Sequence, residues 1–209
     1  MLILNKNILT IGGNRLEGGP LTPPSPPTPP TPQPSFDEVT IGSQTWMSKN
    51  LDIDDGGTGI YHYDNVTANG VNFGTQYYYT LDAAIRIANS INGWHLPSRS
   101  EFQTLVNYVG SNSATKLKSA SGWNDASSTT GSGNGTDNYG FTGLPVGYSD
   151  SNGSKVWNKG SYLYLHSSTI YSSDVQYNYN LYLDYSDTTA RISKDYVTKL
   201  YSVRLIKDT

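Results

Sequence analysis

The stretch Gly93-Trp-His-Leu-Pro-Ser-Arg-Ser-Glu-Phe-Gln-Thr-Leu-Val-Asn-Tyr-Val-Gly110 contains the clearest structural signal in the chain. Within it, Ser98 and Glu101 have the spacing of a capping box, in which each side chain accepts a hydrogen bond from the other residue's free backbone amide. From Phe102 onward, apolar residues recur at i, i+3, i+4 and i+7, and the glycine at the end is a typical helix stop. The stretch therefore predicts a tight turn followed by an amphipathic helix.

A second helix is predicted after Thr80, whose hydroxyl can cap it, because apolar residues recur from Leu81 through Ala88. Most other segments are short, aromatic and β-branched, and Gly, Asn and Ser interrupt them. Such segments predict brief strands with long loops. They include Val39–Ile41, Thr45–Met47, Gln76–Tyr79 and Tyr201–Ile206. We therefore predict an α+β fold of two helices and short, mostly antiparallel strands joined by long loops.

Prolines divide the chain, since nine of the 11 lie between Pro20 and Pro34. Such a segment adopts polyproline II, and at ~3.1 Å per residue it spans about 45 Å. It indicates a stalk over residues 20–35, with a disordered linker or a ligand for a partner's aromatic groove as alternatives. Residues 36–209 then form one domain of ordinary size.

Residues 1–19 are too few to bury a core of their own. They alternate apolar residues such as Ile8 and Ile11 with polar ones. We expect them either to be disordered or to dock, as an attachment peptide, on a larger tail or surface assembly. The apolar content favours docking.

Composition excludes several classes of protein. The formal net charge is −3 and no large Lys/Arg cluster occurs, which argues against nucleic-acid partners. No apolar run approaches the ~20 residues of a membrane-spanning helix. The first residues turn polar too early for a signal peptide, so either a leader has been lost or the protein reaches its place of action without the secretory pathway. Cysteine is absent, which excludes disulfides, thiolate metal sites and cysteine nucleophiles.

Catalytic and metal-binding signals are weak. Of the three histidines, His95 lies in a tight apolar turn and is expected to be structural. The segment Asp52–Gly57 suggests a calcium loop, but it lacks the alternating oxygen ligands and the bidentate Glu of a helix-loop-helix site, so an acidic turn is favoured. Asp150–Ser154 can supply oxygens at alternate positions or form an ordinary turn, and a calcium site stays open as an alternative at both segments. We therefore predict no catalytic residue, no metal and no cofactor.

Several phrases, found in order along the chain, resemble the Fibrobacter succinogenes major paralogous domain family. They are Ile41–Leu51, Leu81–Ala84, Gly93–Ser98 with Glu101–Leu105, Thr115–Ser119 with Gly122–Asn124, Gly135–Phe141 with Leu144–Pro145, Ser167–Thr169, and Ser202–Arg204 with Lys207–Asp208. The resemblance implies a C-type-lectin-like domain of the kind found on bacterial surface proteins, especially in Bacteroidetes. This fold is related to that of the formylglycine-generating enzymes, whose active cysteines have no counterpart here.

Two departures from the family pattern are informative. Family members usually carry one Cys before the Gly-Trp-His-Leu-Pro turn and another in the terminal phrase, where this chain has residues near Ser90 and Leu205. Loss of that pair fits a protein that folds in reducing cytoplasm, as a phage structural protein does. The lectin motif Glu-Pro-Asn is also absent, so the resemblance does not imply sugar binding through calcium.

Residues 161–201 supply nine of the 17 tyrosines, with Ser, Asn and Asp in most of the gaps. This is the composition of an antibody combining site. It also suits codons diversified at adenines by a retroelement, as in some proteins of the C-type-lectin fold. The predicted ligand-binding residues are Tyr162, Tyr164, His166, Tyr171, Asp174, Tyr177, Asn178, Tyr179, Asn180, Tyr182, Asp184, Ser186, Asp187 and Arg191.

An alternative is that these tyrosines pack on a sheet as part of the core. Alternation in Tyr177-Asn-Tyr179-Asn puts both tyrosines on one face. We expect Leu163, Leu165, Leu181 and Leu183 to point inward and Tyr182 outward.

These observations together predict a receptor-binding adhesin, specifically a phage tail-tip protein that recognises a bacterial surface protein or glycan. Its location would be the virion or a bacterial cell surface, and a homotrimer is left open. One alternative is a non-diversified surface module of a Bacteroidetes cell. Another is an enzyme on a formylglycine-generating-type fold.

Overall fold

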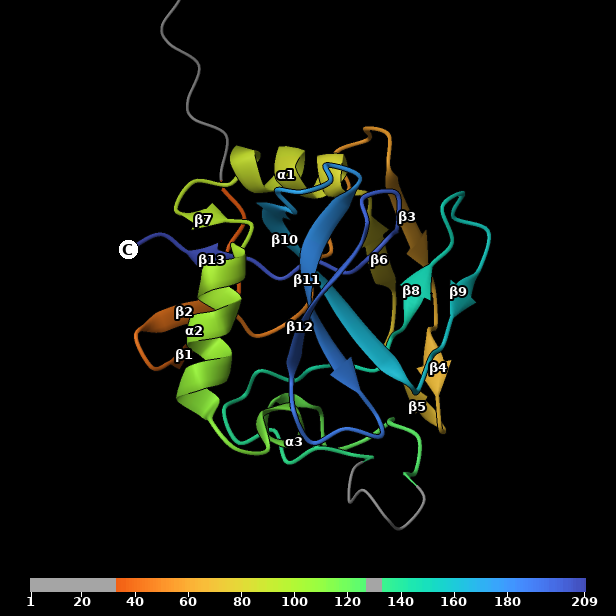
Figure 1. Cartoon of the computed structure of the whole chain (residues 1–209). Coiled ribbons are helices and arrows are strands. Elements are labelled where there is room, and N and C mark those ends of the chain that lie inside the picture. Colours follow the sequence, from red (N-terminus) through yellow and green to blue (C-terminus); the bar gives the residue numbers. More distant parts are fainter. Residues whose placement is uncertain (1–32, 127–132) are drawn as a thin grey trace, which may run out of the picture. The chain divides into compact units, whose positions relative to one another are not determined.

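Five small antiparallel sheets and three helices make up the fold over residues 33–126 and 133–209, which this computed structural model describes (Figure 1). These residues belong to one unit, Gln33–Thr209. The predicted attachment peptide 1–19 and most of the predicted stalk 20–35 lie outside the described residues. The helices are α1 (Leu81–Ser90), α2 (Arg99–Val109) and α3 (Ser113–Leu117). The mixed architecture of few helices and many short strands agrees with the predicted α+β class.

The first sheet has the strand order β1-β2-β13-β7 and joins the two ends of the domain. Its strands are β1 (Glu38–Ile41), β2 (Gln44–Met47), β13 (Ile206–Lys207) and β7 (Trp94–His95). A second sheet has the order β10-β11-β12, with β10 (Tyr162–Ile170), β11 (Tyr177–Asp184) and β12 (Arg191–Tyr196). Three strand pairs complete the fold: β3 (Ile60–Tyr63) with β6 (Gln76–Tyr79), β4 (Thr67–Ala68) with β5 (Val71–Asn72), and β8 (Tyr148–Ser149) with β9 (Val156–Trp157).

Helix α2 begins where the capping box predicts. Ser98 Oγ accepts from the Glu101 amide at 3.2 Å, and the Ser98 amide donates to Glu101 Oε2 at 2.7 Å. The helix ends at Gly110, whose φ of 71° favours glycine. Its buried face includes Phe102, which stacks on Trp46 of β2 with ring centroids 5.6 Å apart. Helix α2 therefore packs on the first sheet, and it also contacts β10, β11 and β12.

Helix α1 is capped as predicted, because Thr80 Oγ1 accepts from the Ala83 amide at 3.2 Å. Its apolar residues Leu81, Ala84 and Ile87 form a second core with the C-terminal segment, in which Val203 and Leu205 are fully buried. The third helix, α3, was not predicted. Its N-cap, Asn112, has a left-handed φ of 56° and makes no capping side-chain bond, and the helix lacks the capping box that marks α2.

The C-terminal segment Tyr201–Ile206 is predicted as one strand, and the structure differs from this prediction. Only Ile206 and Lys207 form a strand, β13, because successive residues bond to different neighbours. Tyr201 pairs with Tyr79 of β6, whereas the carbonyl of Leu205 accepts from the Met47 amide of β2. The segment therefore runs through the centre of the domain and connects its sheets. The other three predicted strands are confirmed as β1, β2 and β6.

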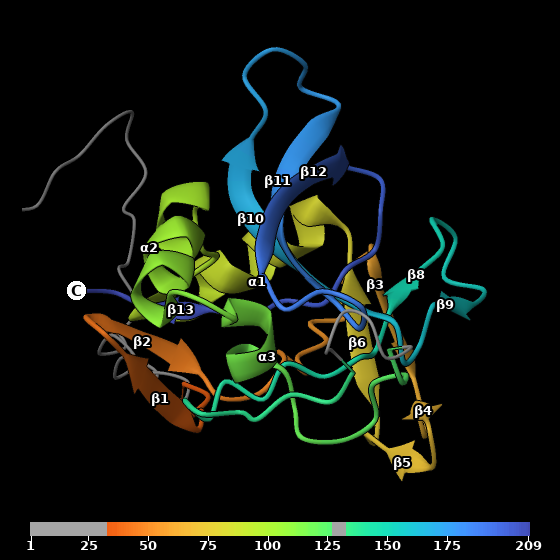
Figure 2. The same ribbon diagram turned by 60° about the horizontal axis from the view of Figure 1, so that its bottom comes forward.

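The β10–β11 hairpin projects beyond the helices in the view of Figure 2. Its anchored half is apolar on one face, where Leu163 pairs with Leu183 and Leu165 with Leu181. All four leucines are fully buried, as predicted. The hairpin therefore has a base fixed in the core and a tip, residues 170–177, that extends from it.

Candidate functional site

The β10-β11-β12 sheet has two faces, so the predicted binding residues do not lie together. They fall into four groups. Side chains alternate between the faces along a strand. Tyr177 and Tyr179 therefore share a face of β11 with Leu181 and Leu183, whereas Tyr182 points to the opposite face. The predicted single surface is thus not one surface.

The first group is a cluster of half-buried tyrosines on the face opposite the leucines. Tyr164 lies across from Tyr182 in the sheet, with ring centroids 4.9 Å apart, and Tyr162 lies 5.5 Å from Tyr182. Tyr164 also stacks on the buried Tyr201 at 4.7 Å with an interplanar angle of 10°. Burial is the main cause that raises the pKa of Tyr164 and of Tyr182. These phenols are therefore neutral at physiological pH. Much of their surface is buried against the other rings of the cluster.

The second group consists of buried polar residues and corrects the prediction. His166, Asn178 and Asn180 are fully buried, so they cannot contact a ligand at the surface, and their assignment as exposed binding residues is wrong. His166 Nε2 lies 2.8 Å from the Tyr79 carbonyl, and Asn178 Nδ2 lies 3.3 Å from His166 Nδ1. This pattern fits a neutral imidazole that donates from Nε2 and accepts at Nδ1. Burial lowers the pKa of His166 to about 4, which favours the same neutral form.

The third group lies in the β11–β12 turn. Asp184, Ser186, Asp187 and Arg191 line a hollow of about 350 Å³ together with Thr188. Asp184 Oδ1 accepts from both the amide and the hydroxyl of Ser186, at 2.8 and 2.9 Å. Asp187 forms an ion pair with Arg191. These polar groups satisfy one another, and they hold the turn in shape.

The fourth group lies at the hairpin tip and its margin, on the leucine-bearing face of β11. Tyr171 and Tyr179 have ring centroids 5.9 Å apart, and Tyr177 and Tyr196 have theirs 4.5 Å apart. Two cations join them. The Arg99 guanidinium lies 4.6 Å from the centre of the Tyr179 ring, and Lys194 Nζ lies 3.6 Å from that of Tyr171. We call the six residues Arg99, Tyr171, Tyr177, Tyr179, Lys194 and Tyr196 the tip strip.

Apolar exposure is concentrated at this tip. Of the five exposed large hydrophobic residues in the described parts of the chain, three lie at the tip or directly beside it: Ile170 at 38%, Val175 at 74% and Tyr196, which pairs with Tyr177, at 46%. The predicted residue Asp174 lies in the same turn, where its Oδ1 accepts from the Gln176 amide at 3.0 Å. Sequence reasoning missed Ile170, Val175 and Tyr196 as site residues, although a valine within a polar turn was a usable signal.

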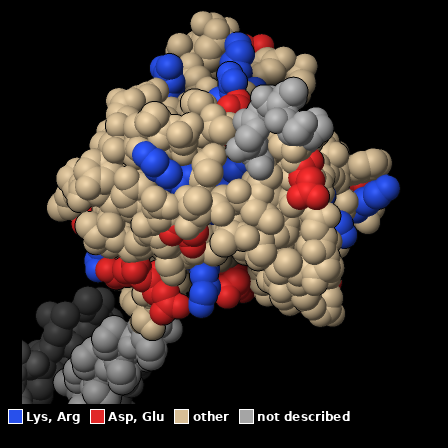
Figure 3. Space-filling model, turned by 90° about the horizontal axis from the view of Figure 1, so that it is seen from below, with Lys and Arg blue, Asp and Glu red and all other residues tan. Residues whose placement is uncertain are grey.

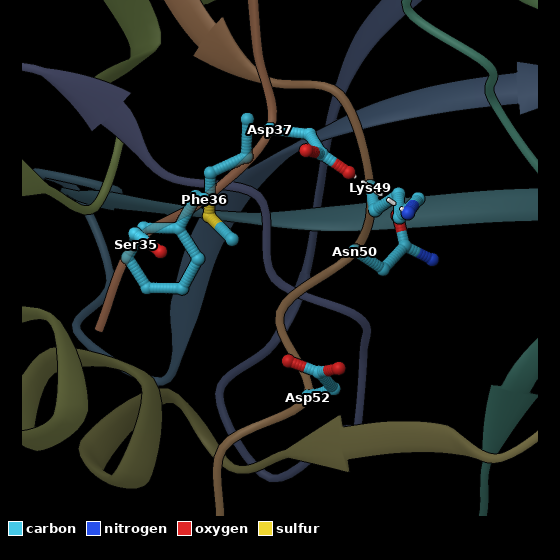
Figure 4. Close-up of a pocket in the computed structure, with 7 residues that line it drawn as sticks. Ser35, Phe36, Asp37, Lys49, Asn50 and Asp52 are labelled. Carbon is cyan, nitrogen blue, oxygen red and sulfur yellow. Dashed lines mark hydrogen bonds and ion pairs between the residues drawn. The ribbon is translucent and has the colours of Figure 1, made fainter.

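Two hollows near the ends of α2 and β2 differ in size. The groove beside the tip strip has a volume of about 450 Å³ and is lined by Arg99, Ser100, Gln103 and Thr169. Figure 4 shows the other, which encloses about 150 Å³ and is crossed by a 2.9 Å ion pair between Asp37 and Lys49. Small-molecule sites occupy roughly 300–1,000 Å³. The groove beside Arg99 is therefore large enough for a small ligand, as is the hollow at the β11–β12 turn, and the hollow of Figure 4 is not.

His95 has a structural position, in keeping with its expected role. Its Nδ1 lies 2.6 Å from Asp208 Oδ1 and its Nε2 lies 2.7 Å from Glu101 Oε1. Partial burial opposes the charged form, but these two carboxylates outweigh it and raise the pKa of His95. With both nitrogens engaged, the ring ties β7 to α2 and to the C-terminal residues. No group of three His, Asp or Glu side chains within 33–126 and 133–209 is arranged to hold a metal ion.

Comparison with known families gives one match. The model of the Fibrobacter succinogenes major domain family matches residues 39–207, most of the chain. The chain belongs to this family. No curated protein and no solved structure matches it significantly.

In this Fibrobacter succinogenes major domain, the phrase Gly93–Ser98 has a structural role. Trp94 and Leu96 of that phrase are buried against α1, and Ser98 caps α2. Leu205, where other members are expected to carry a cysteine, packs in the same core cluster as Ile91, just after Ser90. The tip strip is different, since all six of its residues lie outside the phrases that carry the family resemblance. The phrases that carry the resemblance thus lie mainly in the support, and the tip strip lies apart from them.

Proposed function

We propose that this domain is the binding module of an adhesin, which recognises a bacterial surface protein or glycan and catalyses no reaction. The observation that carries the proposal is the concentration of exposed apolar side chains at the hairpin tip, beside the tyrosines of the tip strip. Exposed apolar patches on soluble domains commonly mark interaction sites. Tyrosine provides a large, rigid and amphipathic contact area at low entropic cost. The mechanism is then non-covalent recognition in which a few aromatic anchors supply most of the energy.

The charge distribution supports a binding surface of this kind. On the face of the molecule seen in Figure 3, Lys and Arg are interspersed with Asp and Glu, without a broad area of either sign. A protein that binds nucleic acid through its phosphates needs a positive stripe or patch. Contact through tyrosines and apolar groups needs none. No helix in the described parts of the chain is long and apolar enough to cross a membrane.

We further propose that the fold is of the C-type-lectin type and that the chain is a phage tail-tip protein diversified by a retroelement. The mixed fold and the Tyr/Ser/Asn/Asp composition of residues 161–201 support this reading. Sequencing the flanking DNA tests it. A reverse-transcriptase gene and a near-copy of the 3′ coding segment that differs only at adenines would support diversification. Absence of both would leave the non-diversified surface module of a Bacteroidetes cell.

A cell-binding assay tests the adhesin itself. Fluorescently labelled protein is added to a panel of intact gut Bacteroidetes strains, and the bound label is measured by flow cytometry. Wild-type protein should bind at least one strain, and Val175→Ser combined with Tyr196→Ser should reduce that binding at least tenfold. Tyr108→Ser is the matched control, because Tyr108 is 58% exposed but lies in α2 outside the tip strip. Equal loss in the control, or no binding to any strain, would refute the proposal.

A further inference from the structure

Neither cation of the tip strip has a carboxylate partner among residues 33–126 and 133–209. Ion pairs in the described residues involve Lys49, Arg86, His95, Arg191 and Lys207, but neither Arg99 nor Lys194. Both lie over tyrosine rings, which position a cation without neutralising it. Their charges therefore remain available to an incoming anion.

Nearby acidic side chains are engaged elsewhere. Glu101 bonds to Ser98 and His95, and Asp174 caps the amide of Gln176 in the hairpin turn. Asp195 accepts from the Tyr201 hydroxyl at 2.6 Å. None of these carboxylates forms an ion pair with Arg99 or Lys194. Within the described residues, the strip therefore presents two unpaired cations, with the carboxylates of Asp174 and Asp195 nearby, on a chain whose net charge is −3.

The groove next to Arg99 offers polar groups suited to hydroxyls. It is lined by the hydroxyls of Ser100 and Thr169 and by the carboxamide of Gln103, in addition to the guanidinium. The carboxamide of Gln103 is oriented by a hydrogen bond from its Nε2 to Asn107 Oδ1 at 2.8 Å. Its Oε1 remains as an acceptor. Thr169 Oγ1 accepts from the Arg99 amide at 2.9 Å, so its own proton can be donated. A volume of about 450 Å³ holds one or two sugar rings.

We propose that the tip strip and this groove bind an acidic saccharide, with Arg99 and Lys194 contacting its carboxylates. The inference rests on the proposed binding function and names its ligand class. A guanidinium matches a carboxylate in two parallel hydrogen bonds. The hydroxyl and amide groups of the groove match sugar hydroxyls, and the exposed ring of Tyr196 matches the apolar face of a pyranose. A long polyanion is a poorer fit, because the strip has two cations and the chain as a whole is acidic.

Titration calorimetry at low salt with three carboxylated saccharides tests the proposal: a galacturonate tetramer, a hyaluronan tetrasaccharide and sialyllactose. Each is compared with its methyl ester, which keeps the ring and removes the charge. At least one acid should bind, its ester should bind at least tenfold more weakly, and Arg99→Gln and Lys194→Gln should each weaken binding about fivefold or more. Lys159→Gln, at an exposed lysine outside the strip, should leave the affinity unchanged.

Several results would overturn the inference. They are no binding to any of the three acids, equal binding of acid and ester, or an undiminished affinity of both the Arg99 and the Lys194 variants. Tighter binding of a hexaglutamate peptide than of any saccharide would assign the strip to an acidic protein segment instead. Cell binding by wild-type protein that survives such a result would leave the adhesin proposal standing while removing this one. Saccharide binding without cell binding would support the saccharide inference and remove the adhesin proposal.

Discussion

The guanidinium of Arg99 lies 4.6 Å from the ring centre of Tyr179, although Arg99 begins helix α2 and Tyr179 belongs to strand β11. The contact connects the projecting hairpin to a helix whose other face is buried against the first sheet. The Arg99 amide reinforces this connection through its bond to Thr169 of β10. The tip strip is therefore presented by a fixed support, which lowers the entropy lost on binding.

Two glycines with nearly the same backbone angle should differ in their tolerance of a side chain. Gly147 has φ +69° and Gly74 has φ +70°, but a Cβ on Gly147 would collide with the carbonyl oxygen of Trp157, whereas Gly74 faces open space. We expect Gly74→Ala to cost about 1 kcal/mol from backbone strain alone. Gly147→Ala should cost at least about 2 kcal/mol more, since the strand β9 must move. Urea unfolding measures both, and equal losses would contradict the packing described here.

The buried Arg204 should be a stability determinant. Its guanidinium donates to Asn50 Oδ1 at 2.7 Å and to the Phe141 carbonyl, and it lies over the Phe141 ring. Burial lowers the pKa of Arg204 to about 9, which reflects the cost of enclosing this cation. Arg204→Leu leaves those acceptors without a donor, so we expect a loss of about 3 kcal/mol in the free energy of unfolding.

Arg191→Leu is the control for that variant. Arg191 is exposed and pairs with Asp187, so its loss should cost less than about 1 kcal/mol. A cost for Arg204→Leu no larger than that of the control, measured by urea unfolding, would show that the hydrogen bonds of Arg204 do not hold the loops together.

His166 should make the protein sensitive to mild acid. Because its folded pKa of about 4 lies below the ordinary value of 6.5, the unfolded chain takes up a proton first as the pH falls. The stability contributed by neutral His166 is thus complete above pH 6.5 and is lost between 6.5 and about 4. The pKa difference corresponds to about 3 kcal/mol. His95 has a raised pKa, so the pH dependence of its contribution to the free energy of unfolding is the opposite. That contribution is present below pH 6.5 and is lost as the pH rises through the raised pKa.

Unfolding free energies of wild type and His166→Gln, measured from pH 7 to pH 4, test this assignment. The variant is expected to be less stable at pH 7 and to lose less stability on acidification. Parallel pH profiles would show that His166 does not remain neutral in the folded protein.

Calcium should not affect stability. The acidic turns that suggest calcium loops are satisfied internally: Asp55 forms two bonds to Arg86, and Asp150 accepts from the amide and hydroxyl of Ser154. The Arg86 bond is the main cause that lowers the pKa of Asp55 to about 2. A calcium site loaded a hundredfold above its Kd would add about 2.7 kcal/mol. Equal melting temperatures in excess EDTA and in millimolar calcium are expected, and a rise of several degrees with calcium would disprove this reading.

Local signals predicted the parts of the fold that depend on neighbours in sequence. The caps at Thr80 and Ser98 and the alternation of Leu181 and Leu183 need only short-range chemistry, and all are found in the structure. The C-terminal segment was misjudged because Tyr201 and Leu205 bond to different sheets, which no local pattern encodes.

The site was predicted less well, for a related reason. Composition located the tyrosine-rich segment, but the direction of each side chain depends on the strand register and on the irregularity between His166 and Ile170. Polar character suggested that Asn178 was exposed, whereas its hydrogen bond to His166 allows it to be buried. The part played by Arg99 could not be inferred, because it comes from a distant helix.

We infer that the tip strip binds a ligand and does not support the fold. The most direct test is one measurement on Tyr177→Ala combined with Tyr196→Ala: binding to the strain that the wild type recognises, with the melting temperature recorded on the same sample. Leu181→Ala, which should cost about 2–5 kcal/mol in stability, defines the signature of a core residue. We predict at least a tenfold loss of binding and a melting temperature within a few degrees of wild type. Retained binding, or unfolding comparable with that of Leu181→Ala, would show that the tip strip is not the binding surface.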